Sequence, residues 1–149
     1  MNIKKFPLLQ RAKCAICGHT VFGVADDEPF MEDRSWFKVE NQQARTVVYT
    51  DSIVTYIGKT DSLGNKIFEG DVVEFEMESL DTEGEYVYEH YVVMFSEKYC
   101  SFCLFNKKGV GQVEIVDFNC DSIKVKVIGN VYDNPELVEG WSEPKDVSL

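Results

Sequence analysis

The sequence lacks a long apolar run and has only two histidines, the residue type that most often acts as a general base. No apolar stretch approaches the roughly 20 residues of a membrane-spanning helix, and the basic start has too short an apolar stretch for a signal peptide. We therefore expect a cytoplasmic protein that does not cross a membrane. The only histidines are His19 and His90, and neither a Gly-x-Ser-x-Gly motif nor a phosphate-binding loop occurs. The sequence predicts that the protein is not an enzyme.

Lysine and arginine are absent from residues 67–97, although the net charge of the chain is only −11. This window holds ten acidic residues and no basic one, and so it contributes −10: Glu69, Asp71, Glu74, Glu76, Glu78, Asp81, Glu83, Glu85, Glu89 and Glu97. Such a field disfavours binding to phosphate backbones, which needs clustered lysine and arginine. It attracts basic protein surfaces instead. We expect no direct nucleic-acid contact, and a protein partner or self-association.

Helical patterns are scarce, and most of the chain is typical of short strands separated by turns. Residues 46–57 are rich in β-branched and aromatic side chains, with an interruption at 50–52. In residues 72–78, Val73, Phe75 and Met77 alternate with three glutamates, which predicts a strand with one buried face. Further strands are expected at 86–95, 99–105, 113–118 and 123–127, with turns at 61–65, 69–71 and 106–109. This spacing favours a compact β-barrel or sandwich.

The two ends of the chain differ from this pattern. Residues 1–45 show no sustained period and predict an irregular strand-and-loop layer packed on the barrel, not an independent domain. The barrel domain is expected at residues 46–140. Near its end, Asn134 before Pro135 predicts the start of a short helical turn. Residues 141–149 are expected to form a polar tail from which Trp141 can pack back on the barrel.

Five cysteines in a chain without an export signal argue against a disulfide framework. Two pairs have the Cys-x-x-Cys spacing of a zinc knuckle, Cys14 with Cys17 and Cys100 with Cys103. The favoured interpretation is that these thiols are buried apolar groups and that no cofactor is bound, because residues 99–105 read as a strand that places Cys100 and Cys103 on opposite faces. The alternative is a zinc site formed by the four thiolates, in which His19 could replace one of them.

Two blocks, residues 56–75 and 127–137, combine turn and strand residues in a specific way. They contain Tyr56, Gly58, Asp61, Gly64, Ile67, Glu69, Gly70, Asp71 and Val72, then Val127, Ile128, Gly129, Asn130, Tyr132, Asn134, Pro135 and Leu137. In this combination the chain resembles the YopX family, small proteins carried by bacteriophages and prophages. The resemblance implies an SH3-like β-barrel, a bacterial host cell, and a homo-oligomer as one option. It implies no catalytic residue, and the Cys-x-x-Cys near the start departs from the family's usual short opening.

Within the first block, Glu69-Gly70-Asp71 invites interpretation as a site, because two acids flank a bend. Turn chemistry is the favoured explanation. Gly70 supplies backbone freedom, and a short acid beside it can accept hydrogen bonds from the N–H groups of the turn.

The favoured function is a non-enzymatic protein-binding module of a phage or prophage accessory protein. The acidic window lies beside Tyr86, Tyr88 and Tyr91, and aromatic residues are enriched at interfaces. One alternative is an acidic nucleic-acid mimic that blocks a DNA-binding protein. Another is a zinc-stabilised nucleic-acid-associated protein, favoured only by a few basic residues around Cys14.

Overall fold

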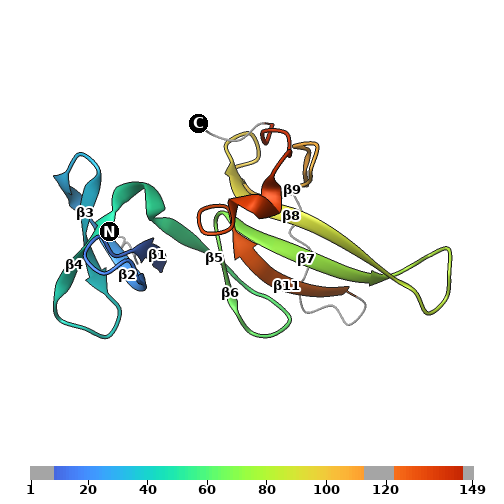
Figure 1. Ribbon diagram of the computed structural model, residues 1–149, viewed down its shortest axis with the longest axis horizontal. Coiled ribbons are helices and arrows are strands. Elements are labelled where there is room, and N and C mark those ends of the chain that lie inside the picture. The colour runs from blue at the N-terminus through green and yellow to red at the C-terminus, as the bar shows by residue number, and fades with distance from the viewer. Residues whose placement is uncertain (1–8, 113–122, 146–149) are drawn as a thin grey trace, which may run out of the picture. The chain divides into compact units, whose positions relative to one another are not determined.

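The computed structural model describes residues 9–112 and 123–145, and these form a mainly β protein, as predicted; its strands make two antiparallel sheets (Figure 1). The strands are β1 (Gln10–Lys13), β2 (Thr20–Met31), β3 (Arg34–Val39), β4 (Arg45–Tyr49), β5 (Val54–Thr60), β6 (Lys66–Phe68), β7 (Asp71–Glu78), β8 (Tyr86–Ser96), β9 (Ser101–Phe105), β10 (Gly111–Gln112) and β11 (Ile123–Asn130). Two 3-10 turns, η1 (Thr50–Ser52) and η2 (Pro135–Val138), are the only helical elements in these ranges. The predicted strand at 113–118 lies outside the described residues.

The strand order is β4-β3-β2-β1-β5-β6 in one sheet and β10-β9-β8-β7-β11 in the other. Neither sheet closes into a barrel over residues 9–112 and 123–145. The compact barrel expected from the strand spacing is therefore not found, because that spacing is shared by barrels and open sheets. In the described part of the chain, no helix is long and apolar enough to cross a membrane.

The chain divides into two compact units, unit 1 (residues 1–56) and unit 2 (residues 57–149). Residues 46–56 belong to unit 1, whereas the sequence placed them with the barrel domain. The interruption predicted within residues 46–57 is confirmed as η1, which separates β4 from β5. The chain therefore turns here instead of running on as one strand.

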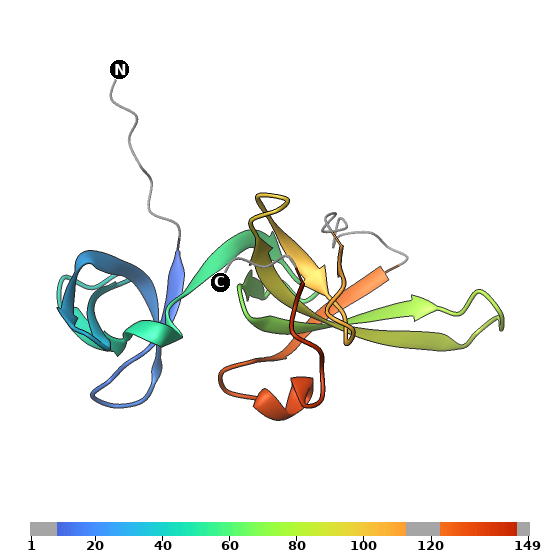
Figure 2. The same ribbon diagram turned by 90° about the horizontal axis from the view of Figure 1, so that it is seen from above.

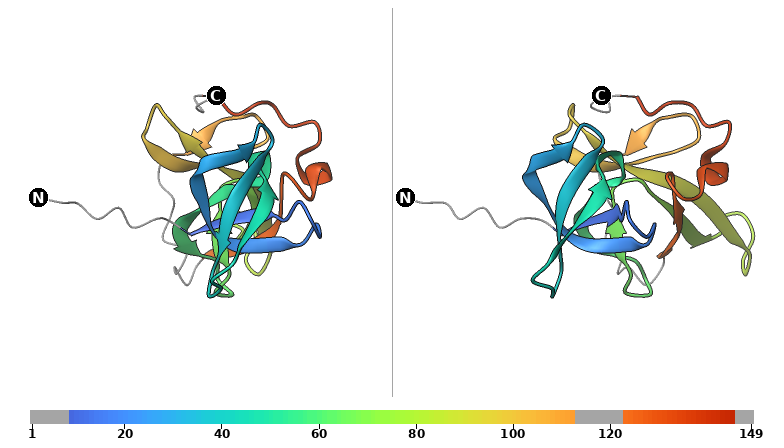
Figure 3. Two further views of the ribbon diagram at one scale, coloured as in Figure 1. Left: turned by 90° about the vertical axis from the view of Figure 1, so that its left-hand side faces the viewer. Right: turned by 60° about the vertical axis from the view of Figure 1, so that its left-hand side comes forward.

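Unit 1 is built from β1 to β4, each paired antiparallel with the next in sequence. A single bridge from Cys14 to Val48 connects the segment after β1 with β4. Figure 3 shows these strands, blue to cyan, bent around a common interior. Its buried core is small and consists of Ala12, Phe37 and Val48.

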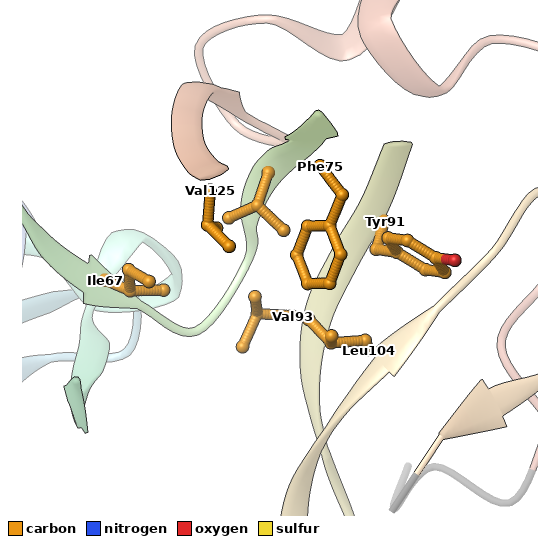
Figure 4. Packing of buried hydrophobic residues seen from close by; sticks show 7 residues of the cluster. Ile67, Phe75, Tyr91, Val93, Leu104 and Val125 are labelled. Carbon is orange, nitrogen blue, oxygen red and sulfur yellow. The ribbon is translucent and has the colours of Figure 1, made fainter. Parts of the chain in front are cut away.

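Unit 2 has the larger core, which lies on one face of β7, β8, β9 and β11. Val73 and Phe75 are buried and Met77 is half-buried, as the alternation predicted. The cluster also contains Ile67, Tyr91, Val93, Leu104 and Val125 (Figure 4). The rings of Phe75 and Tyr91 lie 5.0 Å apart, and the Tyr91 hydroxyl points away from the aliphatic side chains. β8 lies between β7 and β9 in the sheet.

Among the described residues, the opposite face of this sheet is covered at one end. There Val92, Cys103 and Phe105 form a second buried cluster, against which Val131 and Trp141 pack. The predicted helical turn near Asn134 is present as η2. However, the Asn134 side chain does not cap η2 but accepts a hydrogen bond from Asn130 N–H at 3.3 Å. The other end of the face carries the polar residues described next.

Candidate functional site

The end of the β7–β8 face that lies away from Val92 and Trp141 carries three pairs of acidic and aromatic side chains in register. Antiparallel pairing sets Glu74 opposite His90, Glu76 opposite Tyr88 and Glu78 opposite Tyr86. We call these six residues the acid–aromatic face. The sequence singled out the glutamates and the tyrosines, but only the register of β7 with β8 joins them into one surface. Figures 1 and 2 show the β7–β8 hairpin reaching beyond the neighbouring strands of unit 2.

Hydrogen bonds connect the two strands across this face. His90 Nε2 lies 2.8 Å from Glu74 Oε2, and the Tyr88 hydroxyl donates to Glu76 Oε1 at 3.2 Å. The negative charge of Glu76 and this hydrogen bond raise the pKa of Tyr88, so that its phenol stays protonated at neutral pH. Both tyrosines remain open to solvent, since Tyr86 is 58% exposed and Tyr88 is 56% exposed.

β11 limits the acidic character of this face on one side. Its register with β7 places Lys126 beside Glu74 and Lys124 beside Glu76. Opposite charges on directly facing residues of neighbouring strands attract one another. The sequence showed alternating lysines in this strand, but it could not show that they line up with the glutamates. Two rows of side chains therefore cross β11, β7 and β8, and each runs from a lysine through a glutamate to an aromatic residue. The rows are Lys126, Glu74 and His90, and Lys124, Glu76 and Tyr88.

On the other side, a groove of about 510 Å³ runs beside β8. Tyr88, Glu89, His90 and Tyr91 line it from β8, and Asn106, Lys107 and Lys108 line it from the turn after β9. Burial, together with a hydrogen bond to Glu89, raises the pKa of Tyr91 to about 12. Tyr91 therefore acts here as a neutral hydrogen-bond donor. Sequence reasoning did not assign Lys107 and Lys108 to this surface.

The two Cys-x-x-Cys pairs lie in different units and have different surroundings. Cys14 is buried in unit 1, and Cys17 is exposed on the turn between β1 and β2. In unit 2, Cys103 is buried in β9 and Cys100 is exposed just before this strand. No group of three or more histidine, cysteine, aspartate or glutamate side chains with metal-binding geometry occurs in residues 9–112 and 123–145. A four-cysteine zinc site stays a prediction, since it would join residues of both units.

The thiols of the two pairs also differ in their hydrogen bonds. Thr46 Oγ1 lies 3.4 Å from Cys14 Sγ. This bond, with further N–H donors from Cys17 and Ile16, lowers the pKa of Cys14 to about 7 although burial opposes the change. Burial alone raises the pKa of Cys103, which donates weakly to Ser101 O. Cys14 is therefore the better thiolate of the two buried cysteines.

Two aspartates within residues 56–75, Asp61 and Asp71, accept hydrogen bonds from the backbone. Asp61 is buried, and its carboxylate accepts hydrogen bonds from the backbone N–H groups of Leu63, Asn65 and Val127 at 2.8–3.1 Å. Burial alone would raise its pKa, but these donors outweigh burial and lower it. Asp71 is fully buried and accepts a bond from Phe68 N–H at 2.8 Å.

The Glu69-Gly70-Asp71 bend has the geometry expected of a turn. Gly70 has φ +87°, and its carbonyl accepts a hydrogen bond from Val131 N–H at 2.9 Å. Glu69 is half-buried, and burial raises the pKa of its carboxyl. Hydrogen bonds from Val131 N–H to Gly70 and from Val127 N–H to Asp61 therefore join residues 127–137 to residues 56–75. This connection between the two blocks was not evident from the sequence.

The fold and this face define a mainly β protein with a projecting, tyrosine-bearing hairpin. The family model described as YopX protein matches residues 22–139, and the chain therefore belongs to the YopX family. This finding confirms the resemblance inferred from the two blocks and extends it over β2 to β4. Cys14 and Cys17 lie before the matched residues. No curated protein matches the chain.

Proposed function

We propose that the protein is a non-enzymatic protein-binding module of a phage or prophage, active in the cytoplasm of a bacterial host. The acid–aromatic face is its contact surface. The observation that carries this proposal is the pair Tyr86 and Tyr88, each more than half exposed and each directly opposite a glutamate. Exposed tyrosines supply large contact area with a polar end, and they are enriched in interfaces.

Charge indicates the chemistry of the partner. The loop between β7 and β8 adds Asp81, Glu83 and Glu85 to the three glutamates of the face, whereas the lysines of β11 lie on the opposite side. A partner with lysine or arginine side chains would fit the hairpin end, because Lys107 and Lys108 line the groove beside β8 and the lysines of β11 lie at the other edge. Such charge complementarity raises the association rate and excludes partners of the wrong sign.

The same register favours protein binding over nucleic-acid mimicry. A mimic needs carboxylates spaced like phosphates along a surface, but Lys124 and Lys126 share rows with Glu76 and Glu74. The SH3-like arrangement and the homo-oligomer implied by the family resemblance form part of our proposal. Self-association would use the same face only if a basic surface of a second copy met it.

A pull-down from bacterial lysate with three variants tests the proposal. The double variant Tyr86→Ala/Tyr88→Ala removes the aromatic contacts, and Glu76→Lys/Glu78→Lys reverses the charge. Tyr99→Ala is the matched control, because Tyr99 is also an exposed tyrosine of unit 2 but lies off this face. We expect partners that the wild type and Tyr99→Ala retain at equal levels and that both face variants lose by about 10-fold or more, as is typical of interface hot spots. Equal retention of all partners by all variants would contradict the proposal.

A further inference from the structure

Cys14 and Cys17 lie at a turn that is closed by backbone hydrogen bonds of Cys14. Cys14 N–H donates to His19 O, and Gly18 N–H donates to Cys14 O, both at 2.9 Å. Gly18 has φ +76°, a conformation that glycine adopts without strain and that reverses the chain directly after Cys17. The turn therefore closes on itself and holds the two cysteines near one another.

One side chain from another strand approaches the Cys14 sulfur, since Thr46 Oγ1 of β4 lies 3.4 Å from it. A cysteine, a second cysteine three positions on and a glycine after it, on a turn closed by backbone hydrogen bonds, form the arrangement in which knuckles hold a metal-bound thiolate. Two thiols of one such turn can bind the same ion.

The second Cys-x-x-Cys has none of this. Cys100 Sγ donates to Glu97 O at 3.4 Å, and Cys103 Sγ donates to Ser101 O at 3.7 Å, so both sulfurs face carbonyl acceptors. Cys103 is also packed among Val92 and Phe105. Cys103 is fully buried within β9 while Cys100 is exposed before it, so these two thiols do not share one closed turn.

We propose that Cys14 and Cys17 form a two-thiolate site for one thiophilic d10 cation, with zinc as the biological member of this class, and that Cys100 and Cys103 take no part in it. Thr46 acts as a positioning residue that orients the Cys14 sulfur. One copy of unit 1 supplies two ligands, while a structural zinc site has four. The remaining positions are filled by water or by the same pair of a second copy.

Titration of the reduced, metal-free full chain with Cd²⁺ tests this site, with the ultraviolet thiolate-to-cadmium absorption as the readout. Cys17→Ser and Cys100→Ser are a matched pair, because both cysteines are exposed and neither supports a core. We expect Cys17→Ser to lower the affinity for Cd²⁺ by about 100-fold and Cys100→Ser to leave it unchanged. Thr46→Val should lower it by about 10-fold, the size of an effect on a residue that orients a ligand. Circular dichroism of each variant checks that the strands are retained.

The stoichiometry distinguishes the sources of the other ligands. One Cd²⁺ per chain with the absorption of two thiolates assigns water to the open positions. One Cd²⁺ per two chains with the absorption of four thiolates, and a dimer by size-exclusion chromatography, assigns them to a second copy. An equal loss of affinity in Cys17→Ser and Cys100→Ser would overturn the proposal in favour of the four-cysteine site. Absence of a saturable absorption in the wild type would overturn it altogether.

Discussion

Units 1 and 2 each use a polar side chain to hold backbone that lies far away in sequence, but the two side chains differ in charge. In unit 1, Ser52 Oγ accepts a hydrogen bond from Lys13 N–H at 2.8 Å, across 39 positions. In unit 2, the Asp61 carboxylate accepts Val127 N–H at 3.1 Å, across 66 positions, while it also bonds Leu63 and Asn65. Hydrogen bonds to a charged group are roughly twice as strong as neutral ones.

The two units also differ in how deeply the side chain that stabilises the turn is buried. Ser52 is a half-buried hydroxyl at the end of η1, and its own O–H is satisfied by Tyr49 O at 2.7 Å. Asp61 is 2% exposed, and its neighbour Ser62 adds a bond from Val125 N–H at 2.8 Å. A buried carboxylate with several donors cannot be replaced without leaving those donors unpaired. We therefore expect unit 2 to depend more on this one residue than unit 1 depends on Ser52.

The largest effect should follow from Asp61→Ala. This change removes the buried acceptor of three part-buried hydrogen bonds, from the N–H groups of Leu63, Asn65 and Val127. We expect it to lower the free energy of unfolding of unit 2 by about 3–5 kcal/mol. Denaturant unfolding, monitored through hydrogen exchange of the β11 amides, measures the effect. Asp81→Ala, in the exposed loop after β7, is the control and should change the stability by less than about 0.5 kcal/mol. A loss below about 1 kcal/mol for Asp61→Ala would refute the comparison.

The same residue makes the stability of unit 2 depend on pH. The pKa of Asp61 is lower in the folded protein than its ordinary value of 3.8. Its contribution to stability is therefore present above pH 3.8 and is lost as the pH falls through the lowered folded pKa. In Asp61→Asn, the acid-induced loss of stability should be smaller than in the wild type between about pH 5 and pH 2.

A smaller effect is expected from two glycine substitutions at turns of unit 2. Gly70 and Gly64 have φ +87° and +85°, so an alanine at either position is strained by about 1–2 kcal/mol. At Gly70 a Cβ would also lie 2.8 Å from the Tyr132 ring, whereas at Gly64 it would meet open space. Gly70→Ala should therefore destabilise unit 2 by about 2–4 kcal/mol, and Gly64→Ala by only the strain. Thermal unfolding of the pair separates steric overlap from strain, and equal losses would show that Tyr132 moves aside.

The smallest effect should come from Ser52→Ala in unit 1. The change removes one neutral acceptor from Lys13 N–H, and we expect a loss of about 1 kcal/mol in the stability of unit 1. Hydrogen exchange at the Lys13 amide provides a local measurement. Ser52→Thr retains the hydroxyl and serves as the control. A loss as large as that of Asp61→Ala would remove the difference between the units.

Strand positions and turn positions were largely predictable, because they follow from local chemistry. The alternation of Val73, Phe75 and Met77 with glutamates fixed the buried face of β7. The interruption at residues 50–52 and the positive φ of Gly64 and Gly70 also followed from residue type. β9 begins only at Ser101, later than predicted, because Cys100 itself adopts φ +50°. The residue type does not predict this conformation, because a positive φ is uncommon for cysteine.

The acid–aromatic face was only half predictable. The glutamates and tyrosines were identified from composition, but their pairing depends on the register of β7 with β8. Lys124 and Lys126 meet Glu76 and Glu74 only through the pairing of β11 with β7, strands separated by more than 40 residues. Long-range register is set by burial of one face and cannot be read from either strand alone.

The sequence by itself determined that this is a mainly β protein, a member of the YopX family, with an acidic window that contains several tyrosines. Local periodicity and turn chemistry are sufficient for that, because they act between neighbouring residues. The tertiary structure decided that Asp61 holds β11, that Thr46 approaches Cys14, and that the two Cys-x-x-Cys pairs have opposite hydrogen-bond surroundings. These depend on contacts between residues far apart in the chain, which only the packing of the strands brings together.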